Sequence, residues 1–104
     1  MAAAVAAGAA VPDIPSVTLS NNASMPMVGY GLYKVTSEEA EEITSTALNL
    51  GYRHLDSASF YGNEAGVGNA IAKSGIARSE LFIVSKVWTD CIGLGREAVI
   101  SSVS

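Results

Sequence analysis

The chain has 104 residues, of which 49% are hydrophobic and 15% charged, with a formal net charge of -4. These totals indicate a soluble globular protein of one domain or part of one, because compact domains run from about 50 to 250 residues. The acidic balance and the lack of a Lys/Arg cluster exclude the usual nucleic-acid and anionic-membrane binders. A single cysteine, Cys91, excludes an internal disulfide and favours a reducing compartment; a cytoplasmic location is expected because nothing in the sequence indicates another.

The first residues form an alanine-rich run without Lys or Arg. The run is too short to cross a bilayer, which takes about 20 apolar residues, and it lacks the cationic start of a secretory signal. We therefore predict a disordered tail at residues 1–15 and a folded region at residues 16–104.

The folded region opens with a predicted β-hairpin. Two extended pieces, Val17–Leu19 and Met25–Met27, flank a polar turn at Ser20–Ala23. The next apolar piece, Val28–Tyr33, predicts a short strand whose glycines permit another backbone to approach closely.

A first helix is predicted from the capping signals around residue 36. Thr36 is an N-cap candidate with Glu39 at the capping-box spacing, and Gly51 follows where the apolar period ends. The positions expected to face inward are Ala40, Ile43, Ala47 and Leu50.

Two further strand and helix pairs follow at similar spacing. The predicted strands are Arg53–Ser57 and the apolar run Leu81–Trp88; the helices begin at Asn63, as N-cap, and near Arg96, with Gly75 ending the first of them. The inward positions of that helix are predicted to be Val67, Ala70 and Ile71. Alternating strands and helices indicate a parallel α/β sheet, either an open doubly wound sheet or a closed (β/α)₈ barrel.

Three polar side chains are expected to meet at one edge of that sheet. Asp56 lies at the end of one strand, Tyr61 in the loop after it, and Lys86 toward the end of the next strand. Because the carboxyl ends of parallel strands share an edge, the pattern predicts a carboxylate, a phenol and an amine in one pocket.

Longer stretches carry a resemblance. The run from Gly51 to Ile71 resembles the signature of the aldo-keto reductase family, Phe82–Trp88 is similar to its catalytic-lysine strand, and Met25–Gly31 is similar to its opening hairpin and first barrel strand. The likeness extends from about Val17 to Ser104, the N-terminal third of such an enzyme. It implies a partial TIM (β/α)₈ barrel, and a full-length monomer that binds NADPH and reduces small-molecule carbonyls to alcohols.

The family's tetrad is Asp, Tyr, Lys and His, and the resemblance implies that Asp56, Tyr61 and Lys86 fill its first three places. The histidine would come from a strand after the third helix. The chain's one histidine, His54, precedes the aspartate and does not match that place.

The resemblance further implies binding roles near the tetrad. Cofactor contacts are expected from Asp56, Tyr33 and Lys34, and substrate contacts from Tyr33, Tyr61 and Trp88, while no metal site is expected. Two positions depart from the family pattern, since Leu32 stands where many members have Thr and Tyr33 where many have Trp.

The three residue types suit carbonyl reduction. A carbonyl group that accepts a hydride at its carbon needs a proton donor at its oxygen. The hydride itself comes from the cofactor. Tyr61 is a candidate donor, but a free phenol has a pKa near 10. The Lys86 ammonium would stabilise the phenolate left behind, and Asp56 would keep that ammonium charged and oriented.

Two other functions stay open. Gly93-x-Gly95-x-x-Ala98 fits a loose dinucleotide fingerprint and would suit a small nucleotide-binding domain. A short inactive protein that associates with other chains through an open sheet edge is the second. Because a barrel of this kind takes about 250 residues, we predict that residues 1–104 alone neither bind NADPH tightly nor turn over substrate.

Overall fold

The computed structural model describes residues 13–91 and 93–103. The predicted tail at residues 1–15 lies outside this part apart from residues 13–15. The elements in chain order are β1 (Ser16–Thr18), β2 (Ser24–Pro26), β3 (Tyr30–Gly31), α2 (Ser37–Asn49), β4 (His54–Asp56), η1 (Ser59–Tyr61), α3 (Glu64–Ser74), η2 (Arg78–Glu80), β5 (Phe82–Val84) and α4 (Arg96–Val103). Among them, no helix has the length and apolar character needed to cross a membrane.

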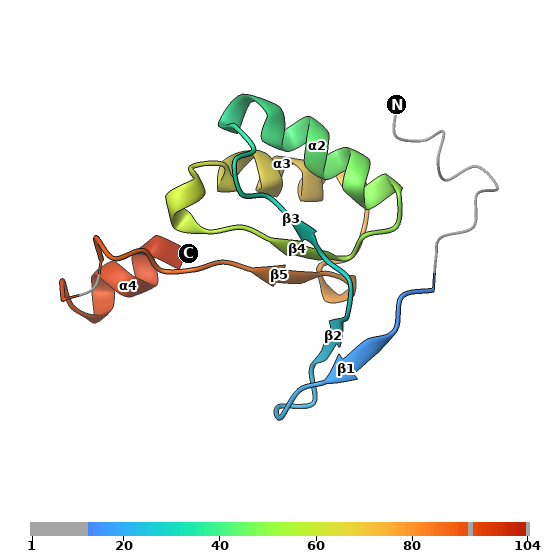
Figure 1. Ribbon diagram of the computed structural model, residues 1–104, viewed down its shortest axis with the longest axis horizontal. Helices are drawn as coiled ribbons and strands as arrows, with labels where there is room; N and C mark the ends of the chain where they lie inside the picture. Colours follow the sequence, from blue (N-terminus) through green and yellow to red (C-terminus); the bar gives the residue numbers. More distant parts are fainter. Residues whose placement is uncertain (1–12, 92, 104) are drawn as a thin grey trace.

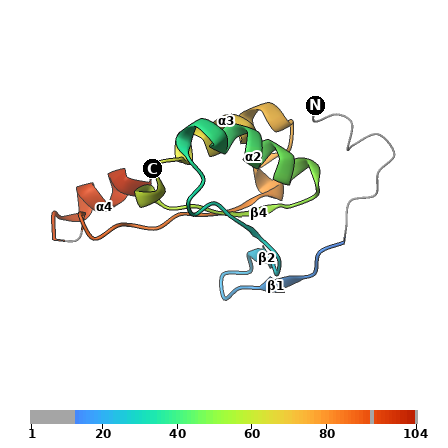
Figure 2. The same cartoon turned by 45° about the horizontal axis from the view of Figure 1, so that its top comes forward.

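The strands form a hairpin and a small parallel sheet. β1 and β2 pair antiparallel, as the sequence predicts, and β3, β4 and β5 form a parallel sheet with β4 in the centre. Helices α2 and α3 lie on one face of that sheet, while the hairpin lies away from them and α4 lies beyond the end of β5 (Figures 1 and 2). The parallel strands of the described part thus form a short open sheet with helices on one face, which is the arrangement of part of an α/β barrel and not of a closed barrel.

The strands β3 and β5 are shorter than predicted. Of the expected strand Val28–Tyr33 only Tyr30–Gly31 pairs, and of Leu81–Trp88 only Phe82–Val84 pairs. The apolar run predicted a β5 covered on both faces, but its three residues are only half-buried. The reason is that α2 and α3 cover one face and no described helix covers the other (Figure 1).

Helix α2 begins and ends as predicted, with one inward position wrong. Thr36 Oγ1 accepts a hydrogen bond from the Glu39 amide at 3.3 Å and donates one to the Glu39 carboxylate at 2.8 Å. Gly51 takes a positive φ of 108° just after the helix, which favours glycine. Leu50 was expected inside but is 55% exposed, because it is the C-cap and leaves the helical face. The buried positions are Ala40, Thr44, Ala47 and Leu48.

Helix α3 packs closely on α2. A Cβ atom added at Gly66 would lie 2.7 Å from Ala40 Cβ, so the missing side chain allows the approach. Val67 and Ala70 are buried as predicted, and Ile71 packs against the core. Asn63 is the N-cap of the helix, as predicted, although its side chain makes no capping hydrogen bond.

The core lies between the sheet and these helices. Its fully or nearly fully buried members are Leu32, Leu48, Leu55, Val67 and Leu81. Burial of a side chain of this size stabilises the fold by about 1.5–3 kcal/mol. The core therefore holds β3, β4, β5, α2 and α3 in fixed relation.

His54 ties the hairpin to the sheet. Its Nδ1 lies 2.9 Å from the Pro26 carbonyl oxygen, and its ring meets Phe82 edge-on at 5.0 Å between centroids. Gly29 leaves room for this ring, because a Cβ there would lie 2.8 Å from His54 Cγ. The histidine thus has a structural position, consistent with its exclusion from the tetrad.

Candidate active site

Strand alternation places Asp56 and Lys86 on the same side of the sheet. Asp56 is level with Val84 in the register of β4 and β5, and residues side by side in a sheet point to the same face. Lys86 follows Val84 by two residues, so it returns to that face. Leu55, the residue before Asp56, is buried in the core with Leu48 of α2 and Val67 of α3. The Asp56 and Lys86 side chains therefore lie on the opposite side of the sheet, which we call the open face.

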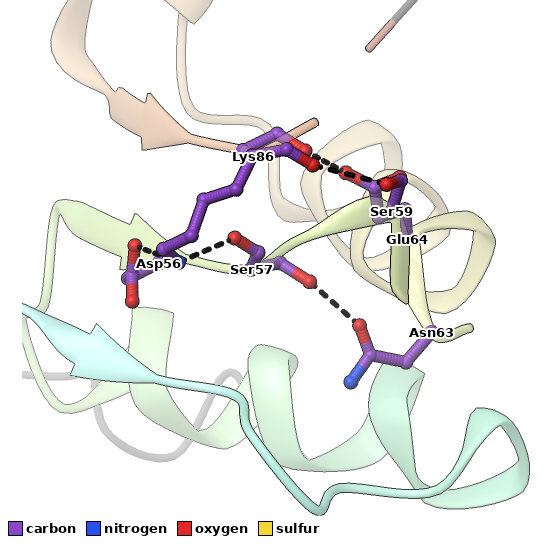
Figure 3. A network of polar contacts seen from close by, with 7 residues as sticks. Asp56, Ser57, Ser59, Asn63, Glu64 and Lys86 are labelled. Atoms are coloured by element: carbon purple, nitrogen blue, oxygen red, sulfur yellow. Dashed lines mark hydrogen bonds and ion pairs between the residues drawn. The ribbon is translucent and has the colours of Figure 1, made fainter. Parts of the chain in front are cut away.

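The lysine ammonium is held by two oxygens. Lys86 Nζ donates to Asp56 Oδ1 at 2.8 Å and to the Ser57 carbonyl oxygen at 2.8 Å (Figure 3). The Lys86 and Asp56 side chains are 45% and 39% exposed, so a ligand can reach the pair. The fixed amine beside a carboxylate is the first half of the predicted cluster.

Tyr61 completes the cluster. It is the last residue of the short helical turn η1, which follows β4. Gly62, just after it, has a positive φ of 68°. Lys86 Nζ lies 5.2 Å from the centroid of the Tyr61 ring. The structure thus brings together the three residues that the sequence placed in one pocket.

The surroundings of Lys86 act in both directions on its pKa. Burial lowers the pKa, while the hydrogen bond and charge of Asp56, followed by Tyr61, raise it, and the net result lies above the ordinary lysine value. Lys86 therefore stays a charged ammonium across the neutral range. An ammonium is the form that can stabilise a neighbouring phenolate.

Tyr33 extends the site toward β3. Its ring lies 5.2 Å from that of Tyr61, tilted by 48°, and the residue is 62% exposed. Lys34 Nζ lies 5.6 Å from the Tyr33 ring centroid, so Lys34 reaches the cluster through Tyr33. Neither residue belongs to the core, and both are available for binding.

Trp88 has an aromatic partner that was not among the predicted site residues. Its ring stacks on Phe60 at 4.0 Å with an angle of 18° between planes, and the two residues are 40% and 55% exposed. Phe60 directly precedes Tyr61, so this stack adjoins the cluster. Two adjacent aromatic residues in a loop, Phe60 and Tyr61, were the feature of the sequence that could have indicated this stack.

Polar residues behind the strand tips were also missed. Asn63 Oδ1 accepts from the Ser57 hydroxyl at 2.7 Å (Figure 3). Its Nδ2 donates to the carbonyl oxygens of Leu32 and Val35, each at 2.9 Å. Asn63 is 1% exposed, so these bonds are shielded from water. A buried asparagine that satisfies both donors and its acceptor is a rigid joint.

No side chain projects from β3 next to Asp56 on the open face. Gly31 is level with Asp56 in the sheet, and a Cβ added there would meet nothing within 4 Å. Beside it, a phenol can give a proton, and the ammonium held by a carboxylate can stabilise the phenolate left behind. In the ranges 13–91 and 93–103, no three His, Cys, Asp or Glu residues gather as metal ligands.

The glycine motif before α4 does not match a dinucleotide loop. Gly93 and Gly95 have positive φ values of 92° and 95°, but residues 85–92 separate them from the end of β5. The fingerprint needs a tight turn that joins strand directly to helix. A separate nucleotide site at this motif is therefore not supported.

Comparison with known proteins agrees with the resemblance. The sequence profile described as Aldo/keto reductase family matches residues 27–102. An aldo-keto reductase from Mycolicibacterium vanbaalenii is 49% identical over 80 residues, which are 77% of this chain and 29% of that protein. The chain thus spans about a third of the length of the curated relatives it matches, 29% and 35% for two of them.

Solved structures show the same fold. The crystal structure of an aldo/keto reductase from Brucella melitensis superposes with a TM-score of 0.80 at 41% identity, over 88% of this chain and 35% of that one. The Bombyx mori aldo-keto reductase, crystallised in complex with NADP, gives a TM-score of 0.78 at 28% identity, over 89% and 33%. The arrangement of β3, β4, β5, α2 and α3 is therefore that of the first part of such a barrel.

Proposed function

This chain belongs to the aldo-keto reductase family, and we propose that Asp56, Tyr61 and Lys86 form the proton-donating part of an NADPH-dependent site that reduces aldehydes and ketones to alcohols. The observation that carries the proposal is the convergence of the three side chains on the open face. Lys86 Nζ lies 2.8 Å from Asp56 Oδ1 and 5.2 Å from the Tyr61 ring centroid.

Each residue has a separate role. Tyr61 gives its hydroxyl proton to the carbonyl oxygen as hydride reaches the carbon. Lys86 stabilises the phenolate that remains, and its raised pKa keeps it charged while it does so. Asp56 holds the ammonium in place. General acid assistance of this kind contributes roughly 10²- to 10⁴-fold to the rate.

NADPH, when bound, supplies the hydride. Support for this cofactor comes from the Bombyx mori reductase, whose structure holds NADP. We assign the cofactor contacts to Asp56, Tyr33 and Lys34, because the Tyr33 ring packs on Tyr61 and Lys34 lies over the Tyr33 ring. Tyr33, Tyr61 and Trp88 would line the substrate side, with Phe60 as an added member because it stacks on Trp88.

We also propose that these 104 residues by themselves do not turn over substrate. The only histidine of the sequence, His54, precedes Asp56 and bonds the Pro26 carbonyl oxygen of the hairpin, so this chain does not contribute the tetrad histidine that the family implies. The open face, unscreened by other strands among the described residues, also leaves the cluster in contact with water. We expect the complete reductase to act as a monomer in the cytoplasm.

A graft tests the proposal. Residues 16–104 would replace the matching third of the Brucella melitensis reductase, to which they are 41% identical. The graft is expected to oxidise NADPH in the presence of an aldehyde, whereas the 104-residue chain alone is expected not to. The same graft with Lys86→Met serves as control and should lose activity while it remains folded.

An inactive graft that folds would contradict the proposed reductase function. Association of the 104-residue chain into defined oligomers would then favour the second candidate, a protein that pairs through the open edge of β5. That edge has no partner strand within the described residues.

A further inference from the structure

Two consecutive residues at the start of α3 each hold a serine at the tip of a different strand. Asn63 Oδ1 accepts from the hydroxyl of Ser57, just after β4, at 2.7 Å. Glu64 Oε2 accepts from the hydroxyl of Ser85, just after β5. One helix start therefore reaches both strand tips from the helix-covered side (Figure 3).

Each serine is the direct neighbour of a charged member of the cluster. Ser57 follows Asp56, and Ser85 precedes Lys86. Because neighbouring residues of an extended chain point to opposite faces, a serine fixed toward α3 directs its charged neighbour to the open face. The dipeptides Asp56-Ser57 and Ser85-Lys86 thus share one arrangement, in which a serine is held toward α3 and its charged neighbour lies on the open face.

The helix start is itself firmly anchored. Asn63 Nδ2 donates to the carbonyl oxygens of Leu32 and Val35, both at 2.9 Å, in the connection from β3 to α2. The backbone of Lys86 is fixed as well, because its carbonyl oxygen accepts from the amide and the hydroxyl of Ser59 at 3.2 and 3.0 Å. The lysine side chain then bonds Ser57, the residue that Asn63 holds.

We propose that Asn63 and Glu64 are positioning residues, which set the separation of Asp56 and Lys86 by fixing Ser57 and Ser85 to one rigid helix start. The inference rests on the proposed function for its catalytic meaning. Its geometric content, that the two serine bonds determine how closely the ammonium meets the carboxylate, stands independently of turnover.

The test follows the titration of Lys86 in the whole 104-residue chain. Lysine labelled with ¹³C and ¹⁵N gives three side-chain signals, from Lys34, Lys73 and Lys86, so two lysines serve as references in each sample. In the parent chain the pKa of Lys86 is expected above the ordinary lysine value. The same spectra report whether each variant is folded.

Four substitutions separate the serine bond from other effects. Ser85→Ala and Glu64→Ala each remove the bond, and both should lower the pKa of Lys86 toward the ordinary value. Glu64→Gln keeps an acceptor for Ser85 without the charge and should leave that pKa nearly unchanged. Val67→Ala weakens the core around α3 without touching either serine, so it should not move the pKa.

The Asn63 half is tested in the same way. Ser57→Ala removes the hydroxyl that Asn63 holds and should lower the pKa of Lys86, whereas Ser57→Thr keeps a hydroxyl and should restore it. If Ser85→Ala does not fold, Glu64→Ala gives the same information from the other partner.

Three results would overturn the inference. The first is an unchanged pKa of Lys86 in both Ser85→Ala and Glu64→Ala. The second is an equal fall in Glu64→Gln and Glu64→Ala, which would assign the effect to charge alone. The third is an equal fall in Val67→Ala, which would mean general loosening. Since no cofactor or substrate is present, an inactive graft would leave these results interpretable and would count only against the reductase function.

Discussion

The two faces of the parallel sheet follow different rules. On the side of α2 and α3, Leu32 and Leu55 are fully buried and Ile83 packs against them. On the open face, Asp56 and Lys86 are 39% and 45% exposed, and Gly31 presents no side chain. One face therefore carries the buried apolar residues that stabilise the fold, and the other carries the charged residues that we propose act in the reaction.

The strongest challenge to this comparison is a cavity on the helix-covered face. Leu55→Ala should reduce the free energy of unfolding by about 2–5 kcal/mol, since Leu55 is fully buried in the core. Urea unfolding followed by circular dichroism measures the change. The matched control is Gly31→Ala on the open face, expected within about 0.5 kcal/mol of the parent because the added methyl meets nothing. Equal losses in the two variants would refute the division between faces.

A second challenge compares two glycines of the same helix. Gly66→Ala should destabilise by about 1–3 kcal/mol, because the new Cβ would lie 2.7 Å from that of Ala40. Gly68→Ala should stabilise by about 1 kcal/mol, since its Cβ meets nothing and alanine is the better helix former. Thermal melts of the two variants should therefore shift in opposite directions, and shifts in the same direction would show that the contact between α2 and α3 is not tight.

One residue on the buried face, Thr44, is polar and tests how far apolar packing stabilises that face. Thr44 is fully buried in α2, and within the described part of the chain its hydroxyl has no hydrogen-bond partner. Thr44→Val keeps the shape and removes that group, so we expect a gain of about 1 kcal/mol in unfolding free energy. Chemical denaturation checks it, with Thr46→Val as control because Thr46 Oγ1 donates to the Glu42 carbonyl oxygen. A loss of stability in Thr44→Val would reveal a partner for the hydroxyl.

The smallest effect concerns pH and the open face. Burial lowers the pKa of Lys86, but Asp56 and Tyr61 together raise it by more. The pKa in the folded chain therefore exceeds that in the unfolded chain. The stability that the pair contributes is therefore complete below the ordinary lysine pKa of about 10.4 and is lost as pH rises through the folded value. Because both side chains are partly exposed, the contribution lies at about 0–1 kcal/mol.

Asp56→Asn isolates this contribution. The parent and the variant should differ slightly in unfolding free energy at neutral pH, and the difference should disappear at strongly alkaline pH. A difference that persists there, measured by urea unfolding at several pH values, would assign the effect of Asp56 to something other than its charge pair with Lys86.

Local signals predicted the parts of the structure that depend on neighbours in sequence. The Thr36 cap and the glycine stops follow from side-chain chemistry and allowed dihedral angles. The meeting of Asp56 and Lys86 follows instead from alternation along parallel strands that share an edge, and Tyr61 lies in the turn after β4. The family resemblance, confirmed by the match to residues 27–102, placed these pieces in a barrel.

What the sequence did not reveal depends on partners far along the chain. Asn63 is the N-cap of α3 as expected, but its side chain bonds Ser57, Leu32 and Val35 instead of the helix, the last two about thirty positions earlier. The strand β5 is short because no described helix covers its open face. Leu50 is exposed because it is the C-cap of α2, just past the last helical residue Asn49. None of these contacts has a local pattern, so periodicity and capping rules could not predict them.

The most direct test of the proposed site compares two neighbouring phenols in the graft that carries residues 16–104. Tyr61 and Tyr33 have ring centroids only 5.2 Å apart, yet only Tyr61 is proposed to give its proton to the carbonyl. We predict that Tyr61→Phe lowers kcat for NADPH-dependent aldehyde reduction by roughly 10²- to 10⁴-fold, whereas Tyr33→Phe, which keeps the ring, changes kcat far less. Equal effects of the two substitutions, or a Tyr61→Phe variant with unchanged kcat, would contradict the account.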